Sequence, residues 1–265
     1  MEIETKSQKQ IISSIFLKRE VLIDFYLPPL DDLNHCNLLL INDGQDLITM
    51  DFENILNKLY EDGKIEQLLC VGIHCGADRK NEYGTANVLN DRGQGAKAAL
   101  YARFVMEELL PIIRKEYNIS SFNQKAFCGF SLGALSALDI VWNHASEFSK
   151  VGVFSGSLWW RSLSQNDPDF DENKHRIVHN EIKNGDFYPW LKFFFETGTL
   201  DETADRNNNG IIDSIDDTLS LIDDLVNKGY DAEKDIRYLE MRDGKHNVST
   251  WGRVFPEFLK WGWGV

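Results

Sequence analysis

Three residues far apart in the chain have the types and the order of a nucleophilic triad. Ser131 lies in the pentapeptide Gly-Phe-Ser-Leu-Gly of residues 129–133, a pattern that places a serine hydroxyl on a sharp turn between a strand and a helix. Asp201 follows the apolar run 191–197 and a Gly-Thr pair, and His246 is the only histidine after Asp201. A serine attacks a carbonyl carbon when an imidazole takes its proton and a carboxylate fixes the tautomer of that imidazole. The order predicts acyl-transfer chemistry at Ser131.

The acid of this triad has two alternatives in the sequence. Glu202 is the next residue after Asp201, Asp205 lies four positions after it, and both carry the same functional group. The base has no equal alternative, because the other five histidines all precede the acid, whereas the expected order is serine, then acid, then histidine.

Acyl transfer also needs N–H groups that stabilise the negative charge on the attacked oxygen. The residue after the nucleophile, Leu132, supplies the first of these groups, and a loop after an early strand supplies the second. Gly44 and Gln45 open such a loop after the apolar run 38–42, so we expect the N–H of Gln45 there. The alternative is that Asp43 and Gly44 form only a tight turn.

Short apolar runs alternate with helical patterns from one end of the chain to the other. Continuous apolar runs are typical of strands buried on both faces of a sheet. The expected strands are Val21–Leu27, Leu38–Asn42, Leu68–His74, Ala126–Phe130, Val151–Ser155, Leu191–Thr197 and Ile236–Met241. The expected helices lie near Phe52–Tyr60, Ala96–Tyr117, Leu132–Asn143, Asp216–Lys228 and Trp251–Trp261. This alternation predicts the α/β class, with a mostly parallel, doubly wound sheet flanked by helices.

The composition limits the partners of the protein. A formal charge of −14 and a pI near 4.9 argue against general binding to nucleic acid or to anionic membranes, which needs clustered Lys and Arg. Residues 1–10 are polar and charged, and no segment approaches 18 consecutive apolar residues, so we expect neither an export signal nor a membrane span. The four cysteines lack C-x-x-C spacing, which indicates reduced thiols and a cytoplasmic location. They are Cys36, Cys70, Cys75 and Cys128.

A second signal is a twelve-residue stretch, 205–216, with the register of an EF-hand loop. Oxygen-bearing side chains occupy loop positions 1, 3, 5, 9 and 12, and glycine occupies position 6, as in loops that bind calcium. The loop ends in Asp rather than the usual Glu, and no clear helix precedes it. The alternative is an Asn-rich turn in which Asp216 caps the following helix. The expected ligands are Asp205, Asn207, Asn209, the carbonyl of Ile211, Asp213 and Asp216.

At several places the chain resembles the esterase D and enterochelin-esterase-like group of α/β-hydrolases, and the resemblance covers nearly the whole sequence. The similar segments are Asp43-Gly44-Gln45, Arg79–Tyr83, Tyr101–Tyr117 with Glu107–Pro111, Gly129–Gly133, Ser155–Trp160, Gly198–Asp201 and Gly244–His246. The resemblance implies a serine carboxylic-ester hydrolase with Ser131, Asp201 and His246 as its triad. It also implies that the loop carrying Trp159 and Trp160 lies at the substrate pocket.

We therefore expect residues 1–265 to form one esterase domain with the calcium loop as an insertion at 205–216. The partner would be a small acyl, aryl or siderophore-type ester, and no cofactor would take part in catalysis. Ferric siderophores are anionic, so the charge of −14 disfavours them unless Arg79 or Arg161 forms a local basic patch. An acyltransferase of the same fold, a non-catalytic calcium-binding interaction protein and a homodimer stay open.

Overall fold

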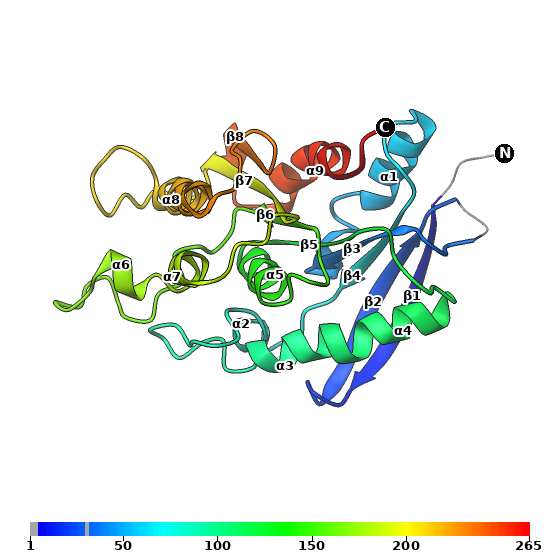
Figure 1. Ribbon diagram of the computed structural model, residues 1–265, viewed down its shortest axis with the longest axis horizontal. Helices are drawn as coiled ribbons and strands as arrows, with labels where there is room; N and C mark the ends of the chain where they lie inside the picture. The colour runs from blue at the N-terminus through cyan, green and yellow to red at the C-terminus, as the bar shows by residue number, and fades with distance from the viewer. Residues whose placement is uncertain (1–4, 30–31) are drawn as a thin grey trace.

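The computed structural model describes residues 5–29 and 32–265, and its centre is one eight-stranded sheet (Figure 1). The strand order is β1-β2-β4-β3-β5-β6-β7-β8. Strand β2 pairs antiparallel with both β1 and β4, while all pairs from β4 through β3 to β8 are parallel. The strands are β1 (Lys6–Ser14), β2 (Arg19–Leu27), β3 (Asn37–Asn42), β4 (Leu68–Ile73), β5 (Lys125–Phe130), β6 (Lys150–Phe154), β7 (Lys192–Leu200) and β8 (Ile236–Lys245).

The helices cover both faces of the sheet, which is why the central strands are apolar throughout. Every residue of β3, β4 and β6 is buried, as the continuous apolar runs predict for a doubly covered parallel sheet. Residues 5–29 and 32–265 contain eleven helical segments, which lie between the strands or after the last one. They are η1 (Gly44–Asp46), α1 (Phe52–Glu61), α2 (Arg79–Glu82), α3 (Ala98–Arg103), η2 (Phe104–Leu109), α4 (Leu110–Glu116), α5 (Leu132–Asn143), α6 (Glu172–His175), α7 (Ile177–Asn184), α8 (Asp213–Lys228) and α9 (Val248–Trp263), of which α3, η2 and α4 run on without a break.

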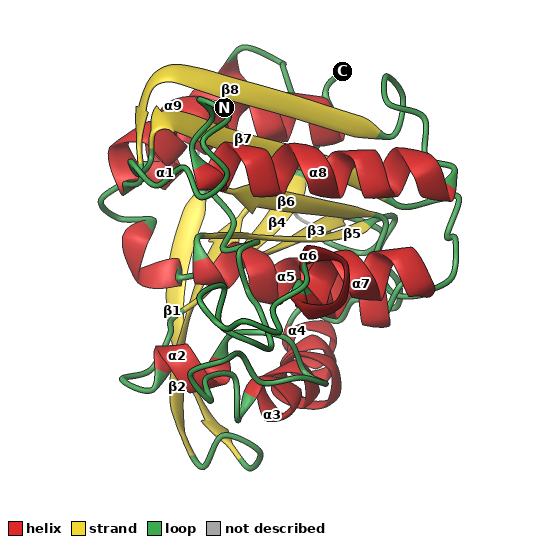
Figure 2. Ribbon diagram, turned by 90° about the vertical axis from the view of Figure 1, so that its left-hand side faces the viewer, coloured by secondary structure: helices red, strands yellow, loops and turns green. Residues whose placement is uncertain are grey.

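Two apolar clusters divide the core between the faces of the sheet. Helices α1 and α9 pack on one face, and α3–α4, α5, α7 and α8 pack on the other. Figure 2 shows α5, α7 and α8 on the same side of the strands, with β8 at one edge of the sheet and β1 near the other. The predicted α/β class and mostly parallel sheet are confirmed.

The expected helix near Ala96–Tyr117 has an irregularity that its periodicity did not indicate. It consists of α3, the π-helical turn η2 and α4. The prediction for Leu132–Asn143 matches α5 at both ends. Within the described ranges, no helix has both the length and the apolar character needed to cross a membrane.

Other boundaries differ from the predictions for identifiable reasons. Strand β1 was not predicted, because it lies at the sheet edge and its first four residues are exposed and polar. Strand β8 continues to Lys245, so His246 follows it directly. Helix α8 begins at Asp213, so Asp216 lies inside its first turn and does not cap it; Ile212 occupies the cap position.

Candidate active site

The turn between β5 and α5 holds Ser131 in a strained conformation. Its φ of 56° and ψ of −120° lie in a region that non-glycine residues rarely occupy outside functional sites. Its N–H donates to the carbonyl of Phe154, 2.9 Å away, which fixes the turn against the neighbouring strand β6. A side chain on Gly129 would collide with the Gly133 carbonyl, and one on Gly133 would lie 2.5 Å from Asp43 Oδ2. Both glycines of the pentapeptide are therefore needed for close packing around the serine.

Ser131, Asp201 and His246 line one cavity of about 240 Å³. They come from three loops that follow β5, β7 and β8, and these strands are parallel, so their carboxyl ends meet at the same edge of the sheet. Asp201 Oδ2 accepts the N–H of Gly198 at 3.0 Å. The other oxygen, Oδ1, is buried and has no hydrogen-bond partner among residues 5–29 and 32–265. One carboxylate oxygen of Asp201 thus stays available to the imidazole.

The surroundings of His246 lower the pKa of its imidazole and so favour the neutral form. Partial burial lowers its pKa below 6.5, the charge of Asp201 opposes this shift, and the charge of Arg79 adds to it. The ring packs edge-on against the indole of Trp251, with 5.3 Å between centroids. A neutral imidazole is the form that accepts a proton from a serine hydroxyl.

The loop after β3 lies against the turn that carries Ser131, and it is held by an ion pair whose carboxylate is buried. Asp43 has a left-handed conformation, with a φ of 58°. Its carboxylate is 2 % exposed and binds Arg79 through both oxygens, at 2.7 and 2.6 Å. Arg79 also donates to the carbonyl of Phe130 at 3.3 Å, and the Asn42 side chain donates to the carbonyl of Gly133 at 2.7 Å. These bonds connect the loop to both sides of Ser131.

The two expected oxyanion donors, Leu132 and Gln45, both lie in the first turn of a helical segment, α5 and η1 respectively. Backbone N–H groups in a first turn have no acceptor within their own helix. The side chain of Gln45 is held at both ends, because its Oε1 accepts the N–H of Cys75 and its Nε2 donates to Asp43, each at 3.1 Å. The backbone of Gln45 is thereby held in place beside the nucleophile turn.

The two tryptophans predicted at the pocket have different environments. Trp159 lines the cavity that contains Ser131. Trp160 is fully buried, and a side-chain carbon on Gly84 would lie 2.9 Å from its ring. The expectation that Trp160 contacts substrate is therefore wrong, since its indole fills the core beneath Gly84 and Gly95.

Sequence reasoning missed two residues close to the cavity. Ser157 Oγ lies 3.4 Å from Ser131 Oγ. Glu196 is fully buried beneath the site, within 3.4 Å of the Ser155 hydroxyl, and burial together with the nearby charge of Asp201 raises its pKa to about 8. Glu196 could have been recognised from its position in the run Phe-Phe-Phe-Glu-Thr. A strand buried on both faces rarely contains an acid, so a carboxylate there indicates an unusual buried group.

In the stretch 205–216, residues 205–212 form a tight loop before α8, and residues 213–216 form the first turn of α8. Asp205 accepts the N–H groups of Asn209 and Gly210 at 3.1 and 2.9 Å. The side-chain amides of Asn207 and Asn209 both reach the carboxylate of Asp216, at 3.1 and 3.2 Å. Loop positions 3, 5 and 12 therefore converge. Within the described ranges, however, no group of three or more His, Cys, Asp or Glu side chains is arranged to hold a metal ion.

Comparisons with known proteins find a matching family and several solved structures with the same fold. The sequence profile of the family described as "Putative esterase" matches residues 14–261. No match was found among curated proteins. Solved structures with the same fold include a ferulic acid esterase, at 16% identity and a TM-score of 0.72, with 98% of each chain covered. Siderophore hydrolase EstB from Aspergillus nidulans has 18% identity and a TM-score of 0.69, with 96% of this chain and 95% of that chain covered.

A third similar structure is the enterobactin esterase FES from Shigella flexneri, determined in the presence of enterobactin. Its identity is 20% and its TM-score 0.71, and the match covers 96% of the present chain. The chain spans only 58% of that enzyme's length. At these identities, the three structures establish a shared fold.

Proposed function

The chain belongs to the esterase family, and we propose that it hydrolyses carboxylic esters through an acyl-enzyme on Ser131. In this mechanism His246 takes the proton of Ser131 Oγ as the oxygen attacks the ester carbonyl, and Asp201 orients the imidazole. The N–H groups of Leu132 and Gln45 stabilise the oxyanion. His246 then protonates the departing alcohol, and a water molecule activated by the same residue releases the acid.

The observation that carries this proposal is the single cavity lined by Ser131, Asp201 and His246. Asp201 lies 70 positions after Ser131, and His246 lies 45 positions after Asp201. No local sequence pattern would by itself bring these three residues to one cavity. Esterases of this kind need no catalytic cofactor, since the protein supplies the nucleophile, the base and the oxyanion donors. Trp159, on the wall of the same cavity, would contact the substrate.

The test is hydrolysis of p-nitrophenyl acetate and butyrate by the wild type and by Ser131→Ala. We expect wild-type turnover and labelling by a fluorophosphonate probe, and loss of both in the variant by at least about 10³-fold. Full activity of Ser131→Ala would disprove the assignment of the nucleophile. If the wild type showed neither turnover nor labelling, the proposal of esterase activity would fail, and the alternative of a non-catalytic interaction protein with a hydrolase fold would take its place.

An acyltransferase shares every step up to the acyl-enzyme and differs only in the acceptor. The two activities are separated by measuring whether product formation depends on an added alcohol. We propose hydrolysis first, because the family match is to an esterase and because the cavity opens to solvent, where His246 is exposed.

We further propose one structural calcium ion in the loop 205–216, held by the six ligands predicted from the sequence. The convergence of Asn207, Asn209 and Asp216 supports it. Residues 1–265 would then form one domain with this loop as an insertion, supported by the single sheet that contains all eight strands. A cytoplasmic location fits the four unpaired cysteines, and whether two copies associate is open to measurement by light scattering.

A further inference from the structure

The hydroxyl of Ser157 faces the proposed nucleophile across the wall of the triad cavity. Ser157 lines this cavity of about 240 Å³ and is only 5% exposed, and its Oγ lies 3.4 Å from Ser131 Oγ. Within residues 5–29 and 32–265, Ser131 Oγ is the one hydrogen-bond partner of this hydroxyl. Ser157 therefore contacts the atom that attacks the ester in the proposed mechanism and later leaves the acyl group.

The backbone around Ser157 holds its hydroxyl in this place. The N–H of Ser157 donates to the carbonyl of Ser131 at 3.1 Å, and the carbonyl of Ser157 accepts the N–H of Trp160 at 3.2 Å. Trp160 is fully buried, so this second bond ties the turn to the core. Ser155 has a φ of 44°, and a side-chain carbon on Gly156 would lie 2.5 Å from a side-chain carbon of β6. A turn this crowded and strained persists only where its surroundings fix it.

The neighbouring hydroxyl of Ser155 is engaged away from the nucleophile. It accepts the indole N–H of Trp251 at 3.0 Å and lies 3.4 Å from a carboxyl oxygen of Glu196. The turn that follows β6 thus directs one hydroxyl into the core and the other, that of Ser157, to Ser131 Oγ.

The separation between the two oxygens indicates when their interaction becomes strong. A well-formed hydrogen bond between two hydroxyls measures about 2.7 Å, so the contact at 3.4 Å is weak in the free protein. Hydrogen bonds shorten and strengthen when the acceptor becomes charged, and catalytic hydrogen bonds often tighten only as the reaction proceeds. An interaction that is stronger in the transition state than in the ground state accelerates that step.

The proposed mechanism decides which hydroxyl donates and in which step. Ser131 gives its proton to His246, so the O–H that remains between the two serines is that of Ser157. In the first half of the reaction Ser131 Oγ must give an electron pair to the carbonyl carbon, and a hydrogen bond to that oxygen does not assist this attack. In the second half the same oxygen is the leaving group and gains negative charge, which a hydrogen bond stabilises.

We propose that Ser157 is a catalytic residue of deacylation, whose hydroxyl donates a hydrogen bond to Ser131 Oγ as that oxygen leaves the acyl carbon. In this step water gives a proton to His246 and forms the new bond to the acyl carbon. The bond between that carbon and Oγ then breaks, its electron pair goes to Oγ, and His246 returns the proton there. Ser157 keeps its own proton throughout. The proposal rests on the proposed function, because it requires an acyl-enzyme on Ser131.

The test is stopped-flow hydrolysis of p-nitrophenyl acetate by the wild type, Ser157→Ala and Ser157→Thr. Nitrophenolate leaves readily, so acylation is fast and appears as a burst, and the slower steady state measures deacylation. We expect Ser157→Ala to slow deacylation about tenfold, the effect of losing one hydrogen bond to a charged oxygen, and to leave the burst rate nearly unchanged. Ser157→Thr keeps the hydroxyl and should retain most of the wild-type deacylation rate.

The steady-state constants separate this role from damage to the cavity. When deacylation limits turnover and it alone slows, kcat and KM fall together, and kcat/KM, which reports acylation, does not change. A distorted cavity would lower kcat/KM as well. More acyl-enzyme should also accumulate in Ser157→Ala during turnover, which mass spectrometry of the quenched protein measures.

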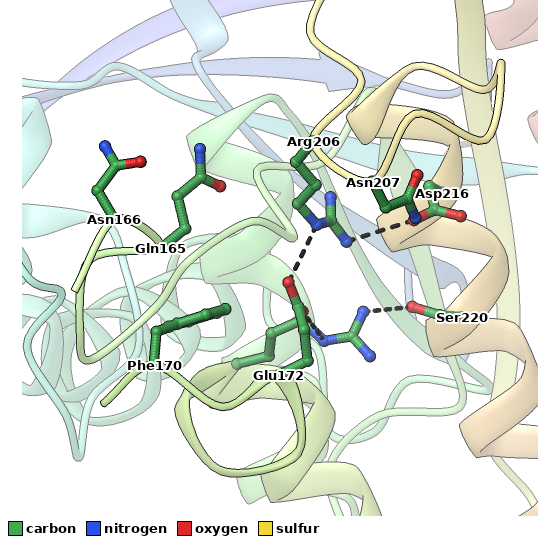
Figure 3. Close-up of a pocket in the computed structure, with 9 residues that line it drawn as sticks. Gln165, Asn166, Phe170, Glu172, Arg206, Asn207, Asp216 and Ser220 are labelled. Atoms are coloured by element: carbon green, nitrogen blue, oxygen red, sulfur yellow. Dashed lines mark hydrogen bonds and ion pairs between the residues drawn. The ribbon is translucent and has the colours of Figure 1, made fainter. Parts of the chain in front are cut away.

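The matched control is Ser220→Ala. Figure 3 shows Ser220 on the wall of a different cavity, of about 640 Å³, where its hydroxyl accepts an N–H of Arg176 at 2.5 Å. Like Ser157, it is a serine that lines a cavity and whose hydroxyl bonds to a neighbouring side chain. Its removal should leave the rates of acylation and deacylation at their wild-type values.

If Ser157→Ala fails to fold, Ser157→Cys takes its place, because a thiol has a similar size to a hydroxyl and is a weak donor. Deacylation should again slow while kcat/KM is unchanged. The proposal is overturned if the variant deacylates at the wild-type rate, or if its kcat/KM falls as much as its deacylation rate. A wild type that releases no nitrophenol would refute the esterase activity itself, whereas a wild-type burst with an unchanged variant would refute only the role of Ser157.

Discussion

Arg79 holds the carboxylate of Asp43 through two parallel hydrogen bonds, Nε to Oδ1 at 2.7 Å and Nη2 to Oδ2 at 2.6 Å. The pair joins the loop that carries Gln45 to the turn that carries Ser131, because Arg79 also donates to the carbonyl of Phe130. Removing one partner of a buried pair leaves the other charge without compensation. The position of Gln45, the proposed second oxyanion donor, therefore depends on Arg79, which takes no part in bond making.

Arg79→Ala should lower kcat for p-nitrophenyl acetate by about 10²-fold, a loss typical of removing one oxyanion donor. Arg79→Lys should restore only part of it, since an ammonium group cannot bind both carboxylate oxygens in the same plane. The measurement is steady-state kinetics of the three proteins, with thermal unfolding to confirm that each is folded.

The matched control for Arg79 is Arg253→Ala. Arg253 binds both oxygens of Asp243, at 3.0 and 2.9 Å, but the two side chains are about half and two-thirds exposed. A surface pair of this kind contributes little, so kcat should not change. If kcat were unchanged in Arg79→Ala, the loop after β3 would not need the ion pair between Arg79 and Asp43 to keep its position.

The pH dependence of activity should reflect the lowered pKa of His246. The protonated imidazole cannot accept the serine proton, so kcat/KM falls as the pH drops through this pKa. Because partial burial and Arg79 place the pKa below 6.5, activity should persist below pH 6.5. In Arg79→Ala the midpoint should move up, and in Asp201→Asn it should move down. A wild-type midpoint above pH 6.5 would contradict this account.

Glu196→Gln should stabilise the protein at high pH and not at low pH. The pKa of Glu196 is raised from 4.5 to about 8, so between these values the unfolded chain releases a proton that the folded protein keeps. Below about pH 4.5 the wild type therefore has its full free energy of unfolding. As the pH rises to about 8, the wild type loses free energy of unfolding relative to the glutamine variant. We expect a difference in the free energy of unfolding of up to about 5 kcal/mol at pH 8.5.

Urea unfolding of both proteins between pH 4 and 9 measures this difference for Glu196→Gln. The matched control is Glu257→Gln, an exposed glutamate on α9, whose effect should be small at every pH. A Glu196→Gln effect of equal size at pH 4 and pH 8.5 would mean that the glutamate does not hold its proton in the folded state.

Much of the fold and the triad candidates could be predicted from local patterns. The apolar runs that became β3 to β7 are buried on both faces, and such strands are distinctive in sequence. Strand β1 could not be recognised in this way, because an edge strand with an exposed polar face lacks that pattern. The order Ser131, Asp201, His246 follows from where strands end, so it was visible without coordinates.

The contacts that hold the site together were not visible in the same way. Asp43 and Arg79 are 36 positions apart, and nothing in either segment indicates which charged residue the other will meet. The burial of Trp160 next to Trp159, which is only partly buried, could not be predicted from the sequence either. Two adjacent tryptophans look alike in sequence, and only the packing of Gly84 and Gly95 decides which one enters the core.

Calcium should stabilise the protein if the loop 205–216 binds it. At a calcium concentration one hundred times the dissociation constant, the gain is about 2.7 kcal/mol, which corresponds to a rise in Tm of roughly 5 to 10 °C for a chain of this size. Chelation should reverse the rise. Asp205→Ala should abolish it, because Asp205 occupies the first ligand position and orders the loop by accepting the N–H groups of Asn209 and Gly210.

The matched control for Asp205→Ala is Asp231→Ala. Asp231 also accepts two backbone N–H groups, from Glu233 and Lys234 at 3.0 Å each, but it lies in the loop after α8, so the calcium response should persist. Calcium should also affect catalysis. The N–H of Ser214 donates to the side chain of Glu202 at 2.6 Å, and Glu202 follows Asp201 in the chain. This bond therefore connects the loop to the proposed triad acid. Equal Tm values with calcium and with chelator, and no calcium in the purified protein, would show that the loop binds no calcium.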